Sequence, residues 1–444
     1  MKIIIAGAGE VGTHLAKMLS REEQDIILID NDSEKLQSLD SNYNLMTLDG
    51  SPTSFSILKQ AGVQNTDLFI AVTPFETRNI TACTIASSLG AKKTVARIDN
   101  FEYLRPENKE FFKKLGVDEL IYPEFLAAQE IINAMRHTWA RNWFELCNGA
   151  VILIGVKVRD NAQIVGRKLY ELTDSSSLYH ISAIKRKHET IIPRGGDEVK
   201  LGDIVYFTTT PEYIEDIRIL TGKQGVDVKD VMIMGGSRIA LRVANDAPSG
   251  IDFKILEIDR DRSYYIAEKV DDAVVIQGDA RDVELLKEEG IKDIDVFIAL
   301  SESSETNILT CLSAKELGVP KTIAEVENIQ FISTAEGLNI GTIINKKLLA
   351  ASWIFQLLLD SDTSSAKCLA MADAEVAELV AKPGSKITQS QVKDLQLPKD
   401  ITIGGLTRDG KGMVVTGTTR IEPGDHVVIF CLDTALHKLE KLFN

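Results

Sequence analysis

The stretch MKIIIAGAGEVGTHLAKML, residues 1–19, decides the fold of this protein. A short apolar strand runs into three glycines at G-x-G-x-x-G spacing, Gly7, Gly9 and Gly12, and a helical apolar repeat follows at once. The first glycine permits a tight turn, the second lets a pyrophosphate approach the backbone, and the third lets the helix lie close to the strand. The stretch therefore predicts a nucleotide-binding turn at the start of a βαβ unit, with helix amides facing an anion.

An altered copy of this turn lies near the middle of the chain, in VMIMGGSRIALRVA, residues 231–244, where Gly235, Ser237 and Ala240 replace the three glycines. When the sequence is shifted by 228 positions, 18 of the 51 residues from Gly50 to Asn100 are identical without a gap. Ordinary residue frequencies give about three identities by chance. The period is too long for a solenoid repeat, so we interpret it as duplication of a whole domain.

Short apolar strands alternate with helical stretches in the first copy, which predicts parallel pairing through right-handed crossovers. A glycine turn followed by this alternation is typical of a doubly wound Rossmann sheet. The expected strands are Lys2–Ala6, Asp25–Asp30, Leu45–Leu48, Leu68–Val72, Thr94–Ile98 and Glu119–Tyr122.

In both halves of the chain, the alternating strands and helices are followed by short strand-like segments with glycine turns and few helices. This pattern indicates a smaller β-rich domain in each half. The predicted fold class is α/β, with two doubly wound Rossmann-like parallel-sheet domains, each followed by a small β-rich α+β domain. The expected boundaries are 1–141, 142–224, 228–360 and 364–444.

The amino-acid composition indicates the cellular compartment of the protein and limits the kinds of partner that it can bind. A net charge of −15 and a pI near 5.0 disfavour nucleic acid as a ligand, because such proteins cluster Lys and Arg against phosphates. Five scattered cysteines without a C-x-x-C pair suit a reducing cytoplasm. The longest apolar stretch, residues 348–359, contains Ser352 and Gln356 and is shorter than the roughly 20 residues of a membrane span, so we expect a packed amphipathic helix there.

The first copy offers further ligand-binding candidates at the carboxyl ends of its strands, where ligands of open α/β sheets bind. Asp30 ends the second strand, and its carboxylate suits both ribose hydroxyls while repelling a 2′-phosphate, which favours NAD or an adenosine nucleotide over NADP. Its alternative role is to cap the next helix. Thr73 and Pro74 follow the fourth strand and Arg97 ends the fifth, with loop chemistry or a surface ion pair as their alternatives.

The second copy keeps Gly235 and Gly236, and we expect Asp259 as its strand-end acid. Ser237 places a Cβ where the pyrophosphate would pass, whereas Arg238 adds a cation that favours terminal phosphates. Three alternatives stay open for this site: a different nucleotide, weak binding or none.

Catalytic patterns are missing from the sequence. No His ends a strand of the first sheet, and no H-E-x-x-H, G-x-S-x-G or P-loop motif occurs, although a dehydrogenase needs a general acid–base beside the nicotinamide. Two unequal nucleotide folds suit ligand sensing better than turnover. The alternatives are an NAD-dependent oxidoreductase and a regulator of another cation transporter.

Segments from both halves, such as DIILIDND, AVTPFETRNITACTIA and GGLTRDGKGMVVTGTTRIEPGDHVVIF, resemble the TrkA family of cytosolic regulatory subunits of bacterial Trk potassium uptake systems. In that family each half is a regulator-of-potassium-conductance (RCK) module, an N-lobe followed by a C-lobe. The resemblance implies a non-enzymatic homo-tetramer, peripheral on the inner face of the cell membrane beneath a TrkH-like potassium-translocating subunit. It also implies binding of NAD(H) and of ATP or ADP without turnover.

The resemblance further implies which residues contact the nucleotides, and it implies no catalytic or metal-binding residue. The contacts it implies are Gly7, Ala8, Gly9, Glu10, Val11, Asp30, Thr73 and Arg97 in the first half, and Gly235, Gly236, Ser237, Arg238, Ile239 and Asp259 in the second.

Overall fold

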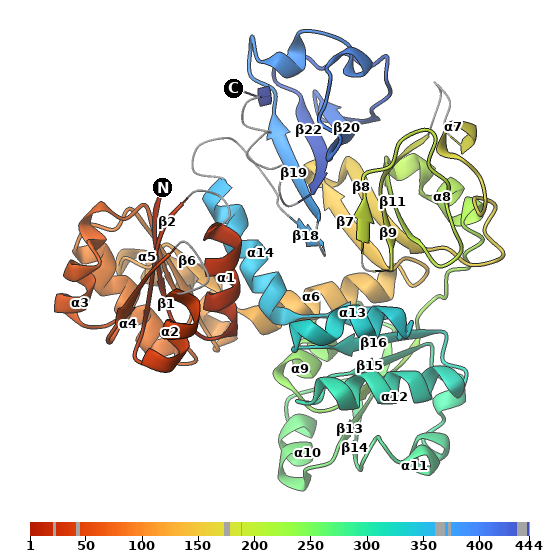
Figure 1. Ribbon diagram of the computed structural model, residues 1–444. Coiled ribbons are helices and arrows are strands. Elements are labelled where there is room, and N and C mark those ends of the chain that lie inside the picture. Colours follow the sequence, from red (N-terminus) through yellow and green to blue (C-terminus); the bar gives the residue numbers. More distant parts are fainter. Residues whose placement is uncertain are drawn as a thin grey trace. The chain divides into compact units, whose positions relative to one another are not determined.

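The computed structural model describes residues 1–20, 24–40, 45–172, 178–187, 189–359, 369–371, 374–432 and 442–443. Contacts divide the chain into two compact units (Figure 1), and each is described by itself. The first unit comprises Met1–Leu126 and Lys346–Leu358, and the second comprises Ala127–Asn345 and Leu359–Asn444. The expected start of the last domain at residue 364, together with Cys368 and His188, lies outside the described residues.

The first unit contains a parallel sheet in the order β3-β2-β1-β4-β5-β6, as expected for a doubly wound fold. The strand order reverses between β1 and β4, which is where such sheets bind ligands. The predicted strands are confirmed to within one residue at each end. They are β1 (Lys2–Ala6), β2 (Asp25–Asp30), β3 (Met46–Asp49), β4 (Leu68–Ala71), β5 (Lys93–Arg97) and β6 (Glu119–Ile121).

Helices follow the strands of this sheet: α1 (Glu10–Ser20), α2 (Ser33–Asp40), α3 (Phe55–Gln60), α4 (Glu76–Ser88), α5 (Pro106–Lys114) and α6 (Pro123–Arg136). One core cluster joins Ile4 and Phe69 of the sheet to Leu58 of α3, Cys83 of α4 and Phe112 of α5. Burial of these apolar side chains drives the sheet and its helices together.

Helix α14 (Lys346–Leu359) also belongs to the first unit, although it follows the last strand of the second parallel sheet. Figure 1 shows α14 beside α1, and Lys347 forms an ion pair with Glu10 at the start of α1. This is the apolar stretch for which we expect a packed helix. Among the described residues, no helix is long and apolar enough to cross a bilayer.

The second unit repeats the parallel arrangement in the order β14-β13-β12-β15-β16-β17. Its strands are β12 (Asp230–Met234), β13 (Asp252–Glu257), β14 (Ala273–Gln277), β15 (Val296–Ala299), β16 (Lys321–Glu325) and β17 (Thr342–Ile344). Its helices are α9 (Arg238–Asp246), α10 (Arg260–Ala267), α11 (Val283–Glu288), α12 (Ser304–Glu316) and α13 (Ile329–Gly337). The shared strand order confirms that the duplicated sequence encodes a duplicated fold.

Two antiparallel sheets complete the second unit, in the orders β10-β9-β11-β8-β7 and β18-β19-β22-β20-β21. The first is formed by β7 (Asn142–Leu146), β8 (Val151–Lys157), β9 (Tyr179–Arg186), β10 (Glu189–Ile191) and β11 (Ile204–Thr209), with the short helices α7 (Leu169–Leu172) and α8 (Ile214–Leu220). The second is formed by β18 (Leu369–Met371), β19 (Ala374–Val380), β20 (Ile401–Arg408), β21 (Lys411–Val414) and β22 (His426–Leu432).

The two antiparallel sheets share one core, in which Leu153 and Tyr206 of the first contact Val376 and Phe430 of the second. The predicted fold class is therefore confirmed.

Candidate nucleotide-binding site

The first glycine turn has the backbone geometry that its sequence predicts. Gly7 has a φ of 115°, a left-handed value that favours glycine, and its amide donates to the carbonyl of Ile29 at 2.8 Å. A Cβ on Gly12 would come within 1.8 Å of the Gly7 carbonyl oxygen, so α1 can approach the turn only if this residue is glycine. A Cβ on Gly9 would meet no atom within 4 Å. Gly9 therefore borders open space at the start of α1.

The residues after the turn present backbone rather than side chains to this space. Ala8 and Val11 are buried, and the carboxylate of Glu10 is held by Lys347. The first amides of a helix have no carbonyl partner within the helix and attract anions. The amides of Gly9, Glu10 and Val11 are therefore the groups with which this turn is equipped to hold a phosphate.

Asp30 lies at the end of β2 with its carboxylate against the turn, where it accepts hydrogen bonds from the amides of Ala8 and, at 3.0 Å, Asp32. The capping contacts that α2 receives come from Asp32, whose carboxylate accepts the Lys35 amide at 3.3 Å and whose carbonyl accepts the Leu36 amide at 3.3 Å. The Asp30 carboxylate therefore lies at the rim of the turn, bonded to its backbone.

Sequence reasoning missed Asn79, which organises the opposite side of the site. This fully buried side chain accepts hydrogen bonds from the amide and hydroxyl of Thr73, at 2.9 and 2.6 Å, and donates to the carbonyls of Thr73 and Arg97, each at 2.9 Å. It thereby joins the ends of β4 and β5. Its identity with Asn307 under the 228-residue shift was the available signal.

Arg97 carries a donor without a partner. Its Nε atom is buried and forms no hydrogen bond with any described residue, while its Nη2 atom lies 3.5 Å from the carboxylate of Asp99. Pro74 is exposed beside Thr73 in the neighbouring loop. An open turn, a rim carboxylate and an unused guanidinium donor together fit the phosphates and ribose of an adenine nucleotide.

The second turn has the same backbone but a different strand-end acid. Gly235 has a φ of 92°, and the amide of Gly236 donates at 2.7 Å to the carboxylate of Glu257, which ends β13 and is buried. The expectation of Asp259 in this position is wrong. Asp259 instead caps α10, accepting the amide of Arg262 at 2.7 Å.

The error has a simple origin in the register of the two copies. Asp25 begins β2 and Asp252 begins β13, an offset of 227 positions, whereas Gly7 and Gly235 are offset by 228. One residue is therefore missing between the first two strands of the second copy. Glu257 is the structural counterpart of Asp30, and Asp259 is the counterpart of Asp32.

Protein groups lie against Gly236, the counterpart of the buried Ala8. A Cβ on Gly236 would come within 1.8 Å of Ile266, and Arg262 donates to the Gly236 carbonyl at 2.8 Å. The hydroxyl of Ser237 accepts the Ala240 amide at 3.2 Å and caps α9. Ile239 is buried and Arg238 is exposed. At the position equivalent to Gly9 the second turn therefore carries a side chain, Ser237, whose hydroxyl already accepts a helix amide, whereas the first turn borders open space.

Comparison with known proteins now decides the family. The TrkA-N domain model matches residues 3–123 and 231–346, and the TrkA-C domain model matches residues 153–221 and 376–444. The chain belongs to the TrkA family. Proteins named Trk system potassium uptake protein TrkA are similar over its whole length, 34% identical in Haemophilus influenzae and 31% in Halomonas elongata, with 98% of each relative covered.

Solved structures share the fold of this TrkA family member at low sequence identity. The RCK domain of GsuK aligns with a TM-score of 0.61 and 14% identity, covering 100% of this chain and 94% of the other. The GsuK channel bound to NAD aligns at 0.59 and 14%, covering 100% and 78%, and GsuK bound to ADP at 0.51 and 14%, covering 80% and 69%. These likenesses show that the chain shares the fold of these structures.

Proposed function

We propose that this protein is a nucleotide-sensing cytoplasmic regulatory subunit that controls potassium uptake through a TrkH-like membrane subunit. The observation that carries the proposal is the contrast between Gly9, which borders open space beside Asp30, and its counterpart Ser237, whose side chain caps α9. Membership of a family whose relatives are named for potassium uptake supports the transport role.

NAD(H) and the adenine nucleotides ATP and ADP are the proposed ligands of the first site. The amides at the start of α1 would hold the diphosphate, Asp30 the ribose hydroxyls, and Arg97 a phosphate or the adenine face. The carboxylate of Asp30 disfavours a 2′-phosphate, so NADP is expected to bind more weakly. Neighbouring structures bound to NAD and to ADP support both ligand classes.

The arrangement of the domains supports binding without turnover as part of this proposal. The first nucleotide fold is followed by a small antiparallel sheet and then by a second parallel-sheet fold, an arrangement that suits regulation. A ligand acts as a signal when it binds two conformations with different affinity. An anion at the start of α1 lies next to Glu10, whose ion pair with Lys347 leads directly into α14. We infer that ligand charge changes this contact and that α14 transmits the change along the chain.

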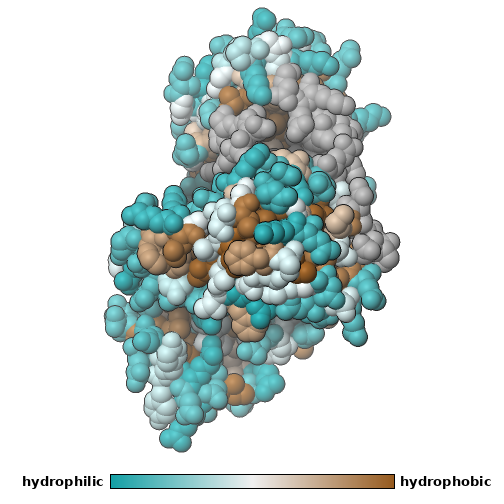
Figure 2. Space-filling view, turned by 90° about the vertical axis from the view of Figure 1, so that its left-hand side faces the viewer, coloured by the Kyte–Doolittle hydropathy of each residue, from teal (hydrophilic) through white to brown (hydrophobic). Residues whose placement is uncertain are grey.

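A homo-tetramer, peripheral on the inner face of the cell membrane, is the proposed assembly. Large hydrophobic side chains are exposed on the first unit, among them Met46, Phe55, Phe75 and Phe111, each more than half exposed. Figure 2 shows hydrophobic groups between hydrophilic ones on one face of the molecule. Contacts between subunits would cover such side chains where they gather on one face.

Substitution of Asp30 tests the site. Asp30→Ala removes the acceptor of the ribose hydroxyls, each bond being worth about 1.5–3 kcal/mol, so NAD and ADP should bind at least about tenfold more weakly in calorimetric titration. Asp25→Ala is the matched control, because Asp25 is an exposed Asp at the other end of the same strand. Equal affinity in the Asp30 variant and the wild type would refute the site.

The oxidoreductase alternative is tested separately, by following NADH absorbance in the presence of the purified protein and candidate carbonyl substrates. The proposal expects NADH to be bound and recovered intact. Steady consumption of NADH, lost in the Asp30→Ala variant, would make the protein an enzyme. Co-purification of the full chain with its membrane partner, followed by identification of that partner, tests the TrkH-like assignment.

A further inference from the structure

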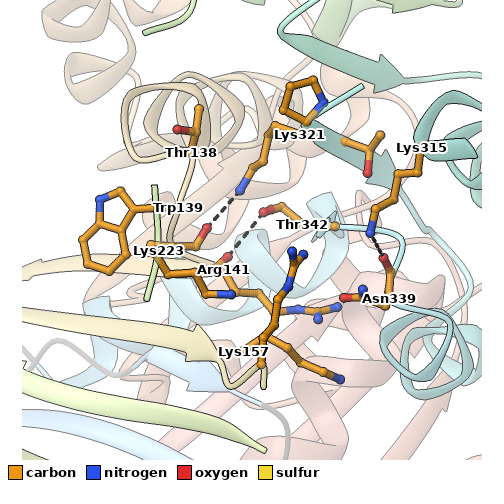
Figure 3. A pocket seen from close by; sticks show the side chains of 14 residues that line it. Thr138, Trp139, Arg141, Lys157, Lys223, Lys315, Lys321, Asn339 and Thr342 are labelled. Carbon is orange, nitrogen blue, oxygen red and sulfur yellow. Dashed lines mark hydrogen bonds between the residues drawn. The ribbon is translucent and has the colours of Figure 1, made fainter. Parts of the chain in front are cut away.

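A second pocket, far along the sequence from the first glycine turn, is lined by six cationic side chains: Arg141, Lys157, Arg159, Lys223, Lys315 and Lys321. It lies within the second unit, and Figure 3 shows the labelled basic side chains extending toward one another from different elements. The whole chain carries a net charge of −15. A concentration of positive charge in so acidic a protein calls for a specific explanation.

The cations come from elements that are widely separated in the chain. Arg141 precedes β7, Lys157 ends β8 and Lys223 follows α8, while Lys315 lies in α12 and Lys321 begins β16. No single helix or loop accounts for the cluster, so it is not the solvated face of one element. The fold of the second unit brings the charges together.

Carboxylates do little to neutralise this cluster. Among the acids, Glu336 has the strongest electrostatic influence on Arg141 and Lys157. Its carboxylate, however, already forms an ion pair with Lys185 at 2.6 Å. Glu130 faces Lys321, and burial raises the pKa of Glu130 to about 7, which reduces the negative charge that it offers at neutral pH.

The basic side chains use backbone carbonyls instead, or have donors to spare. Lys321 donates to the carbonyl of Ala140 at 2.9 Å, and Lys315 donates to the carbonyl of Asn339. The Nη2 atom of Arg141 is buried and has no hydrogen-bond partner among the described residues. A buried guanidinium donor without an acceptor indicates that the acceptor comes from a ligand.

Burial and the neighbouring charges also shift the pKa values of the lysines. Burial, followed by the nearby Arg141, lowers the pKa of Lys321 to about 7, and burial, followed by Arg159 and Arg141, lowers the pKa of Lys223 to about 8. A bound anion relieves this repulsion and raises both pKa values, so binding takes up protons near neutral pH.

We propose that this pocket binds a multiply charged phosphate-type anion, either free pyrophosphate or the phosphate groups of a small metabolite. The cavity measures about 80 Å³. A water molecule needs roughly 10–15 Å³ by the same measure, so the pocket has room for a small oxyanion. Arg and Lys donors arranged around one space are the usual way in which proteins recognise phosphate groups.

The pocket differs from the first nucleotide site in every contributing residue. The glycine turn uses backbone amides of the first unit, whereas this pocket uses side chains of the second. Loss of one site is therefore not expected to remove the other, and the full chain carries two separate means of sensing phosphorylated ligands.

Trp139 lines the pocket and supplies the readout. We expect the tryptophan emission of the full-length protein to change saturably with pyrophosphate, and the Trp139→Phe variant to lose this response. In the Lys157→Gln/Lys223→Gln double variant the affinity should fall about tenfold or more, since two charge-assisted contacts are removed. Lys229→Gln, an exposed lysine of the same unit outside the pocket, is the matched control and should stay within about twofold of wild type.

Thermal unfolding separates binding from folding. Without anion, the double variant should melt no lower than wild type, because repelling charges have been removed. With pyrophosphate only the wild type and Lys229→Gln should gain stability. If the double variant fails to fold, Lys315→Gln alone provides the same comparison with a smaller expected loss.

The source of the phosphate groups is decided by parallel titrations. Tighter binding of ATP than of pyrophosphate, sensed through Trp139, assigns the pocket to a phosphorylated metabolite, and the reverse order assigns it to free anion. The proposal is overturned if neither anion changes the emission, if Lys229→Gln loses as much affinity as the double variant, or if only vesicles of phosphatidylglycerol elicit the response.

Discussion

The two Rossmann-like copies share the hydrogen bonds that join their strands and differ at their glycine turns. In both, a buried Asn ties the end of one strand to the next: Asn79 accepts from Thr73 and donates to the Arg97 carbonyl, and Asn307 does the same with Ser301 and Glu325, at distances of 2.6–3.0 Å. The glycine turns, by contrast, differ at equivalent positions: Gly9 borders open space, whereas Ser237 carries a side chain that accepts the Ala240 amide. The buried Asn that joins the strands is therefore the same in both copies, whereas the residue at the second position of the glycine turn has changed.

The loop after the fifth strand is anchored in both copies, by a carboxylate in the first and by a hydroxyl in the second. The carboxylate of Glu76 accepts the amides of Asp99 and Asn100, at 2.8 and 2.9 Å. In the second copy the hydroxyl of Ser304 accepts the amides of Glu327 and Asn328, at 3.0 and 3.2 Å. Only the first of these anchors brings a negative charge beside the ligand edge.

The largest effect is expected from the shared Asn. Asn79→Ala and Asn307→Ala each leave buried backbone groups without partners, at about 1–3 kcal/mol per group, so each variant should lose about 3 kcal/mol of unfolding free energy. Hydrogen exchange followed by mass spectrometry should show faster exchange in the altered copy. Asn108→Ala, an Asn that bonds on the surface, is the control and should stay within about 0.5 kcal/mol. A large loss of unfolding free energy in only one of the two variants would show that the two Asn residues are not equivalent.

Exchange of the third turn residue between the copies should have a smaller effect. Helix propensity alone would make Gly12→Ala stabilising. Because the added methyl group would clash with the Gly7 carbonyl, we instead expect the variant to destabilise the first unit by about 1–3 kcal/mol. Ala240→Gly should cost about 1 kcal/mol for the ordinary reason that glycine disfavours helices. Denaturant unfolding measures both. Stabilisation by Gly12→Ala would show that the first turn is less tightly packed than described.

The smallest effect on stability, with the sharpest effect on function, is expected at the middle turn residue. Gly9→Ala has open space for its methyl group, so unfolding should change by no more than about 0.5 kcal/mol. The methyl group stands where a diphosphate approaches, so NAD and ADP affinity should fall about tenfold, or about 1.4 kcal/mol.

The reciprocal change, Ser237→Gly, should leave the second copy unable to bind either nucleotide in calorimetric titration, because Glu257, the counterpart of Asp30, stays buried and bonded to the Gly236 amide. Its stability should drop by only a few tenths of a kcal/mol, since glycine is a tolerable helix cap. Gain of NAD binding from this single substitution would mean that the serine alone separates the two sites.

Much of the fold was predictable because its signals are local. Strand limits were correct to within one residue, since an apolar run bounded by turn residues marks each buried parallel strand. Cys83 and Cys311, which coincide under the 228-residue shift, are both fully buried, and burial raises the pKa of both thiols. The strand-end acid of the second copy was misassigned because a single missing residue moves the register without disturbing the apolar pattern.

The sequence by itself determined the duplication, the alternation of strands and helices, and the glycine turn at Gly7, because each depends on residues close together in the chain. Only the tertiary structure decided that Glu257 replaces Asp30, that α14 packs with the first unit, and that Arg141 and Lys321 share a pocket. These facts depend on which surfaces pack together. Spacing along a chain records the period of a helix or strand, whereas the meeting of distant side chains is set by the burial of whole faces.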